Sequence, residues 1–318
     1  MCNQHKIINK NLASECLPKR DDCSNKYTFG HTLIIGGSRK YFGAPILAVK
    51  GSFATGAGMV SLCVPKSIYE TVVKLTPLET IVFPVEETTD GTFSPKSIEQ
   101  ILDYISNKKV TTLCIGCGMD RNEETKQFVN NLLELIYNPN SIFQSKNIYS
   151  IIDADAVVML KIENKKIVPL KETKKQVILT PHIGEYCKLT GKNKEILKEN
   201  PCVEISNFCN LNNIITILKD SITTISDGEH IFKTNTPNSS LAKAGSGDVL
   251  AGMLAGFVYQ IDNFNKNNTK FCPTLKTALL SVYLQSQSAI KGREDKTEFS
   301  FVASDLLTYI PQVIKELK

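Results

Sequence analysis

The stretch Asn238-Ser-Ser-Leu-Ala-Lys243-Ala-Gly245-Ser246-Gly247-Asp248 leads directly into the apolar segment Val249–Val258. This pattern predicts a loop of small residues that ends at the first turn of a buried helix. Glycines let backbone N–H groups converge on one point, and the N-terminus of a helix carries a partial positive charge. Such a loop suits a phosphate group. Asp248 would repel that anion unless it takes a proton from a substrate hydroxyl while the loop holds a phosphoryl group.

Other small and polar motifs follow predicted buried strands. They are Gly36-Gly-Ser38 after Thr32–Ile35, Gly116-Cys-Gly118 after Thr111–Ile115, Asp153-Ala-Asp155 after Ile148–Ile152, Thr180-Pro-His182-Ile-Gly184-Glu185 after Gln176–Leu179, and Lys219-Asp220 after Asn213–Leu218. Strands alternate with helices along most of the chain, which predicts an α/β fold with a mainly parallel sheet and helices on both faces. Ligands bind outside the carboxyl ends of the strands in such sheets. We therefore expect these motifs to meet at one edge.

The remaining pattern predicts one domain over residues 27–318, with no repeat or linker, after a variable, helical or frayed lead-in at 1–26. A two-residue turn at Asp227-Gly228 predicts a hairpin. Helices are expected near 195–210 and, at the end of the chain, over Pro273–Lys291 and Ala303–Lys318. The charged segment Gly292–Glu298 is expected to be a loop between the last two.

Composition and charge narrow the class of protein. The 318 residues are 42% hydrophobic and 22% charged with a net charge of +5, which is typical of a globular protein. The basic residues are scattered, so we expect no nucleic-acid partner. No apolar run reaches membrane-spanning length and the first 24 residues lack a secretory signal, so we expect no membrane partner. A cytoplasmic protein is the expectation, with organellar targeting left open, and we expect a homo-oligomer.

The ten cysteines are dispersed, which indicates reduced thiols and no disulfide framework. Cys114 and Cys117 form an isolated CxxC. A redox or zinc interpretation would need a second pair or a thioredoxin-like context, and the sequence has neither. The chain also lacks GxxxxGK[ST] and a GxGxxG motif after a strand, so a nucleotide must be held in another way.

Several residues of these motifs have two alternative interpretations. Asp153 and Asp155 are candidates to bind Mg²⁺ through water, or one of them caps the next helix. His182 is a capping or core histidine, or a substrate contact, which the flanking Pro181 and Gly184 favour. Lys219 is a point charge for a phosphate or part of a solvated loop. Gly118 permits close approach of a ligand or forms a simple turn.

Taken together, these segments resemble the ATP- or ADP-dependent NAD(P)H-hydrate dehydratases, which are nucleotide-repair enzymes of the ribokinase-like superfamily. The resemblance extends from about residue 27 to the C-terminus. Its most specific part is the combination of Asp153-Ala-Asp-Ala156, Thr180-Pro-His-Ile-Gly-Glu185 and Gly245-Ser-Gly-Asp248. It implies a three-layer α/β/α sandwich with a mainly parallel central sheet.

The resemblance also implies roles for individual residues. Asp248 would be the catalytic base, and the anion hole would comprise Ala244, Gly245, Ser246 and Gly247. The residues meeting the hydrated NAD(P)H would be Ala44, Gly118, His182 and Asp248. Those meeting ATP or ADP, with Mg²⁺, would be Lys219, Asp220, Ser221, Ile222, Thr223 and Gly247. The family commonly joins this domain to an epimerase domain, and we expect any epimerase to be a separate protein.

This sequence departs from the family pattern at four positions within the segments that carry the resemblance. The family usually has proline at Cys117 and Ile183, and commonly has glycine at Asp220 and Ala244. Asp220 places a negative charge beside an expected phosphate contact, and Ala244 lies within the expected anion hole.

Two other functions fit part of the pattern. A ribokinase-like small-molecule kinase, acting on a vitamin precursor or a sugar, would use the same base and anion hole but release a stable phosphorylated product. A scaffold on the same fold would bind nucleotide without turnover, and loss of the base would be its mark. The retained Asp248 favours an enzyme.

Overall fold

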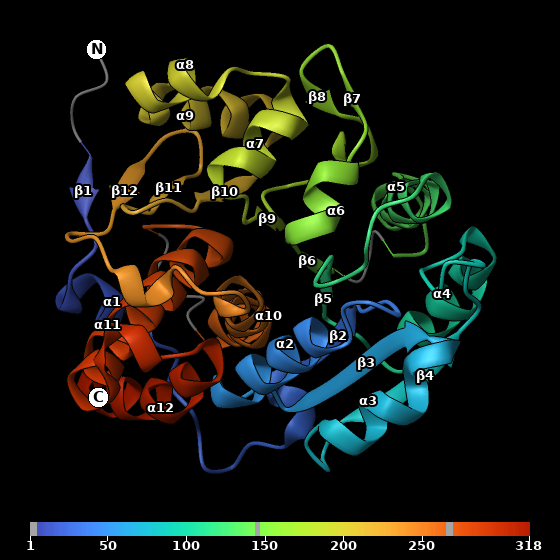
Figure 1. Cartoon of the computed structure of the whole chain (residues 1–318), viewed down its shortest axis with the longest axis horizontal. Coiled ribbons are helices and arrows are strands. Elements are labelled where there is room, and N and C mark those ends of the chain that lie inside the picture. Colours follow the sequence, from blue (N-terminus) through green and yellow to red (C-terminus); the bar gives the residue numbers. More distant parts are fainter. Residues whose placement is uncertain (1–4, 144–146, 265–269) are drawn as a thin grey trace.

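The computed structural model describes residues 5–143, 147–264 and 270–318. Within them, ten strands form one sheet in the order β1-β12-β11-β10-β9-β6-β5-β2-β3-β4 (Figure 1). The strands are β1 (Lys6–Ile7), β2 (His31–Ile35), β3 (Met59–Pro65), β4 (Ile81–Val85), β5 (Thr112–Ile115), β6 (Tyr149–Ile152), β9 (Val177–Leu179), β10 (Ile215–Leu218), β11 (Thr224–Ser226) and β12 (Ile231–Lys233). A separate antiparallel pair consists of β7 (Ile162–Glu163) and β8 (Lys166–Ile167).

The sheet is parallel from β4 to β10, as the alternation of strands and helices predicted. Only at the other end does the direction change within the described sheet, because β11 is antiparallel to both β10 and β12. β11 and β12 form the hairpin expected around Asp227-Gly228. The carboxyl ends of β2, β5, β6, β9 and β10 therefore lie along one edge.

Helices cover both faces of the sheet, which confirms the three-layer arrangement (Figure 1). One face carries α1 (Lys10–Cys16), α2 (Gly43–Ala54), α3 (Tyr69–Leu75), α10 (Ser246–Phe264), α11 (Pro273–Ser300) and α12 (Leu306–Leu317). The other carries α4 (Ile98–Asn107), α5 (Glu123–Tyr137), α6 (Ala154–Met159), α7 (Ile183–Thr190), α8 (Lys194–Glu199) and α9 (Pro201–Asn212). None of the helices in the described residues is both long enough and apolar enough to cross a membrane.

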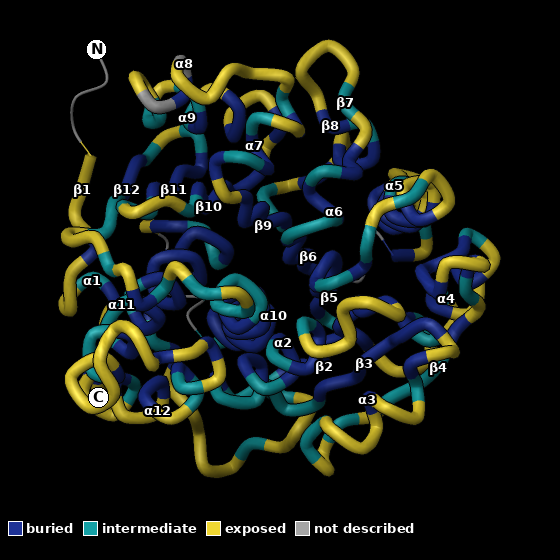
Figure 2. The backbone as a smooth tube through the Cα atoms, in the orientation of Figure 1, coloured by how far each residue is buried: buried dark blue, intermediate teal, exposed yellow. Residues whose placement is uncertain are grey.

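Each face buries its own hydrophobic cluster (Figure 2). Successive side chains of a strand point to opposite faces. Accordingly, Ile34 of β2 packs into the cluster beneath α10, whereas Leu33 and Ile35 pack into the cluster on the other face. The two-sided burial explains why these strands are continuous apolar runs.

The backbones of helices α10 and α2 are in direct contact. A Cβ atom on Gly252 would lie 2.0 Å from the carbonyl oxygen of Ala48, and one on Gly51 would lie 2.5 Å from the carbonyl oxygen of Val249. The hydroxyl of Ser52 donates a 2.9 Å hydrogen bond to the carbonyl of Gly252. Glycines at this crossing therefore fix the position of α10, and with it the position of the loop that precedes it.

Two expected element boundaries were wrong. The segment Gly292–Glu298 is not a loop, because α11 continues to Ser300 with one non-helical residue, Thr297. Its charged side chains are exposed, so a helix accommodates them, and the ammonium of Lys296 pairs with Asp305 at 2.6 Å. The helix expected over 195–210 is divided at Asn200, because Pro201 begins a second helix.

The N-terminal residues that the structure describes join the sheet and its helical layer. Lys6 of β1 pairs with Phe232 of β12. The hydroxyl of Ser14 in α1 donates a 2.8 Å hydrogen bond to the carbonyl of Leu317 in α12. Residues 6–16 thus bind to two parts of the chain that are distant in sequence.

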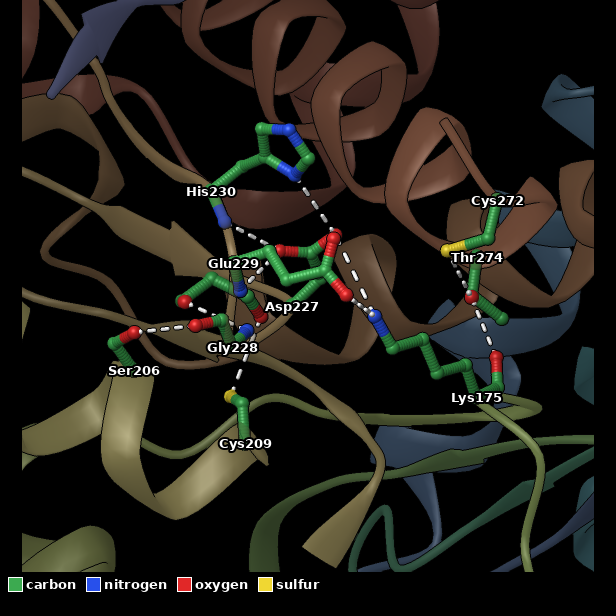
Figure 3. A network of polar contacts seen from close by, with 10 residues as sticks. Lys175, Ser206, Cys209, Asp227, Gly228, Glu229, His230, Cys272 and Thr274 are labelled. Atoms are coloured by element: carbon green, nitrogen blue, oxygen red, sulfur yellow. Dashed lines mark hydrogen bonds and ion pairs between the residues drawn. The ribbon is translucent and has the colours of Figure 1, made fainter. Parts of the chain in front are cut away.

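A polar network holds the β11–β12 turn to its surroundings (Figure 3). The buried carboxylate of Asp227 accepts hydrogen bonds from the backbone N–H groups of Glu229 and His230, at 3.0 and 2.7 Å. The ammonium of Lys175, just before β9, lies 3.9 Å from the same carboxylate. These contacts hold the antiparallel end of the sheet to its parallel part.

The α2–α10 crossing predicts a large difference between two Gly→Ala variants. We expect Gly252→Ala to lower the free energy of unfolding by about 1–3 kcal/mol, because the added methyl group meets backbone at 2.0 Å. Gly43→Ala, in the first turn of α2, is the matched control. A Cβ atom there meets nothing within 4 Å, so we expect no loss. Urea unfolding measures both, and equal stabilities would contradict this account of the crossing.

Candidate active site

The carboxyl edge of the parallel strands opens into a cavity of about 480 Å³. Ten of the residues singled out from the sequence line it: Asp153, His182, Lys219, Asp220, Ser221, Thr223, Gly245, Ser246, Gly247 and Asp248. They come from the ends of β6, β9 and β10 and from the start of α10. The expected convergence is confirmed for the motifs after β6, β9 and β10, whereas the glycine motifs after β2 and β5 do not line this cavity.

Lys219 and Asp153 form an ion pair at the base of the cavity. The ammonium of Lys219 lies 2.7 Å from Asp153 Oδ1, which also accepts a 2.5 Å hydrogen bond from the hydroxyl of Thr180. Asp153 is 1% exposed. Burial opposes the charge of Lys219, but the carboxylates of Asp153, Glu185 and Asp248 outweigh that effect and raise the pKa of the lysine. Lys219 therefore remains a cation that faces the cavity.

Asp248 lies in the first turn of the 19-residue helix α10. Burial raises the pKa of its carboxyl to about 7, and the negative charge of Asp153 adds to the rise. A hydrogen bond from Cys117 and the charge of Lys219 act in the opposite direction. A carboxylate with a pKa near neutrality is suited to accept a proton at physiological pH.

The loop before α10 is held in shape by glycines and by two side-chain contacts. Gly245 has φ +92°, and a Cβ atom on it would lie 2.6 Å from Leu47 Cδ1. The side-chain amide of Gln285 in α11 donates a 2.7 Å hydrogen bond to the carbonyl of Ser246, whose hydroxyl donates to the carbonyl of Leu241 at 2.8 Å. The loop is therefore fixed from both sides.

Gly247 brings the loop close to the ion pair. A Cβ atom there would lie 3.1 Å from Lys219 Nζ and 3.7 Å from Asp153 Oδ2. The first N–H groups of a helix have no partner within it, and Ser246, Gly247 and Asp248 of that first turn all line the cavity. Backbone dipole and lysine charge thus act on the same space, which suits a phosphate.

Asp153 and Asp155 do not face a common ion. Ala154 between them has φ +49°, so the backbone turns and Asp155 points toward Arg121, whose Nε lies 2.5 Å away. Asp153 occupies the N-cap position of α6 but makes no capping hydrogen bond with its side chain. Each carboxylate is paired with a cation, so this pair does not fit a shared Mg²⁺ site.

His182 serves as a cap and also borders the cavity. Its Nδ1 accepts a 3.2 Å hydrogen bond from the N–H of Glu185, and the Glu185 carboxylate accepts one from the His182 N–H at 2.8 Å. The imidazole side chain is 58% exposed. The capping alternative is therefore confirmed, and the exposed ring lines the cavity as well.

Five singled-out residues lie outside the cavity lining: Ala44, Gly118, Ala244, Ile222 and Asp155. Ala44 and Gly118 are neighbours, since a Cβ atom on Gly118 would lie 3.0 Å from that of Ala44. Gly118 directly follows Cys117, whose Sγ lies within 4.8 Å of carboxylate oxygens of Asp153 and Asp248.

Sequence reasoning missed Gln285 and the contact between Cys117 and Asp248. Gln285 had a signal, because a buried amide within an apolar helix must find a hydrogen-bond partner. Cys117 had none beyond its place between two glycines. The site as a whole combines a carboxyl whose pKa lies near 7, a lysine cation and a glycine loop at a helix N-terminus. This combination fits transfer of a phosphoryl group to a hydroxyl.

A sequence profile of the NAD(P)H-hydrate dehydratases matches residues 32–312. The ADP-dependent (S)-NAD(P)H-hydrate dehydratase of Bacillus subtilis is 25% identical over 304 residues, covering 95% of this chain and 95% of that protein. The bifunctional NAD(P)H-hydrate repair enzyme of Dictyoglomus turgidum is 30% identical over 290 residues, covering 91% of this chain and 51% of that protein. The chain spans about half the length of such bifunctional relatives.

The fold is likewise similar to solved structures. The ADP/ATP-dependent NAD(P)H-hydrate dehydratase from Bacillus subtilis, co-crystallised with ATP and Mg²⁺, superposes with a TM-score of 0.77 at 23% identity, covering 99% of this chain and 100% of that one. Since the profile covers most of the sequence, from β2 into α12, the chain belongs to the NAD(P)H-hydrate dehydratase family.

Proposed function

We propose that this protein converts hydrated NADH or NADPH back to the intact dinucleotide, using ATP or ADP as phosphoryl donor. The observation that carries the proposal is the carboxylate of Asp248, which has a pKa of about 7 and lies at a helix N-terminus beside Lys219. The names of the relatives support the substrate class, since they are described as NAD(P)H-hydrate dehydratase or repair enzymes.

In this proposal, Asp248 takes the proton of the hydroxyl on the hydrated nicotinamide ring. The hydroxyl oxygen then forms a bond to the terminal phosphorus of the donor, and the donor's anhydride bond breaks. The ring nitrogen's lone pair expels the new phosphate, and loss of a proton from the neighbouring carbon restores the double bond. Phosphorylation is needed because hydroxide is a poor leaving group and phosphate is a good one.

The backbone of Gly245–Gly247, with Ala244 before it, would stabilise charge on the transferring phosphoryl group. Lys219, Ser221 and Thr223 would hold the adenine nucleotide, because they border the same cavity as the loop. Asp220 and Ile222 belong to this segment by family analogy. His182, Ala44 and Gly118 would meet the hydrated dinucleotide.

Mg²⁺ would enter with the phosphates of the nucleotide. It usually keeps several waters and binds few protein carboxylates. Asp153 and Asp155 are each paired with a cation, so we assign no protein ligand to the ion. We also propose a reducing compartment such as the cytoplasm, since the nine cysteines of the described residues are free thiols.

The function is tested by giving the purified protein hydrated NADH with ATP or ADP and following the absorbance of NADH. Recovery of NADH with stoichiometric phosphate release is the expected result. A phosphorylated product without recovery of NADH would indicate a kinase instead. Nucleotide binding without any turnover would indicate a scaffold, and both results would overturn the proposal.

Asp248→Asn should reduce turnover by at least about 100-fold, because the hydroxyl then loses its base. Nucleotide affinity, measured by calorimetry, should change little. The variant should be at least as stable as the wild type at pH 8. The wild-type carboxyl has a folded pKa above its unfolded value, so ionising it costs stability as the pH rises from about 4 to 7. Substantial residual turnover would contradict the assignment of the base.

The dependence of kcat/KM on pH should report the protonation state of Asp248. Below about pH 7 the carboxyl is protonated, so kcat/KM for the hydrated dinucleotide should fall about tenfold per pH unit. Asp153→Asn removes a negative charge that raises this pKa, and it leaves Lys219 facing Asp248, so the acidic limb should move to lower pH. Asp103→Asn, an exposed carboxylate on α4, is the control and should not move it. An unmoved limb in Asp153→Asn would contradict the electrostatic account.

A further inference from the structure

The turn that follows β5 places a buried thiol against the proposed base. Cys117 is 0% exposed and belongs to the cluster on the α10 face of the sheet. Its Sγ and one carboxylate oxygen each from Asp153 and Asp248 all lie within 4.8 Å of one another. The thiol therefore lies next to the proposed base, although Cys117 does not line the cavity.

The backbone of the turn leaves the thiol little freedom to move away. Gly116 has φ +125°, and a Cβ atom on it would lie 1.9 Å from the carbonyl oxygen of Asp153. The carbonyl of Cys117 accepts a 2.9 Å hydrogen bond from the N–H of Gly37. The turn is thus fixed against the loop after β2 on one side and against the end of β6 on the other.

Four groups from three parts of the fold act on the Asp248 carboxyl. They are Asp153 and Asp155 at the start of α6, Lys219 after β10, and Cys117 after β5. The ammonium of Lys219 donates a hydrogen bond to the carboxylate of Asp153, which also accepts a hydrogen bond from the hydroxyl of Thr180. Lys219 acts on Asp248 through its charge, whereas the Sγ atom of Cys117 lies within 4.8 Å of a carboxylate oxygen of Asp248 and acts on that carboxyl directly.

We infer that Cys117 is a positioning residue for the proposed reaction, donating its S–H to the Asp248 carboxylate and holding it ready to accept the substrate proton. The inference rests on the proposed function of Asp248. It goes beyond that function by giving a role to a residue that contacts neither substrate nor nucleotide in the proposal.

The thiol remains a donor throughout the working pH range. The neighbouring Cys114, burial, and the negative charges of Asp248 and Asp153 raise the pKa of Cys117 well above its usual value. A hydrogen bond to the charged form of a carboxyl favours that form. Removing the donor should therefore make Asp248 harder to ionise.

The test compares Cys117→Ala, which has no donor, with Cys117→Ser, which has an O–H donor. In Cys117→Ala we expect the acidic limb of the kcat/KM profile to shift to higher pH by about 0.5–1 unit. At pH 6 this corresponds to a loss of about three- to tenfold, with near wild-type rates at pH 9. Cys117→Ser should return the limb to the wild-type position or below it.

Cys63→Ala is the matched control. Cys63 is also a fully buried thiol, but it lies in β3 and packs into the cluster on the opposite face of the sheet. Its loss should lower stability to a similar degree and leave the limb in place. A limb that moves equally in Cys63→Ala, or that stays in place in Cys117→Ala, would overturn the inference.

A second measurement does not depend on turnover. The ¹³Cγ resonance of Asp248, assigned by comparison with Asp248→Asn, should titrate at higher pH in Cys117→Ala than in the wild type, and Cys117→Ser should reverse the change. If this titration moves as expected while hydrated NADH is not restored at any pH, the proposed function fails and the contact stands. If it does not move, the contact itself is excluded.

Discussion

The contact between the backbones of α2 and α10 is the constraint on which the rest of the site depends. With glycine at 51 and 252, the two helices approach until a methyl group on either would overlap carbonyl oxygen. This closeness sets where α10 begins, and Asp248 stands in its first turn. The position of the proposed base is therefore set by the packing of its own helix against α2.

The charge balance of the site follows from the geometry. The carboxylates of Asp153, which is buried, and Asp248, which is half-buried, share the neighbourhood of one ammonium, and Lys219 forms a 2.7 Å ion pair with Asp153. Burial is the main reason that the pKa of Asp248 lies near 7, and the negative charge of Asp153, which Lys219 offsets only in part, adds to the rise. The same ammonium remains close to the glycine loop. Lys219 thus pairs with the buried carboxylate of Asp153 and also adds positive charge where we propose that the phosphate binds.

Much of the fold could be predicted because apolar runs and glycine turns are local signals. The runs that form β2, β5, β6 and β10 are buried on both faces, and polar motifs at their ends converge through the geometry of parallel sheets. The start of α10 at Ser246 followed from the small-residue loop and the apolar segment after it.

Other features depend on information that is not local. Asp153 faces the cavity and pairs with Lys219, whereas Asp155 pairs with Arg121, and both partners are distant in sequence from the two aspartates. The charged segment after Gly292 was misread because exposed helices and loops share the same polar residues. The proximity of Cys117 to Asp248 arises from the contact of two elements far apart in the chain.

The pairing of β1 with β12 has a consequence for the order in which the protein assembles. Lys6 is synthesised more than 200 residues before its partner Phe232, and Ser14 is synthesised before Leu317, whose carbonyl accepts its hydrogen bond. Parallel pairing of such distant segments must wait for the intervening chain to be ordered. Residues 6–16 therefore cannot complete these contacts until residues 232 and 317 have been made and brought into place.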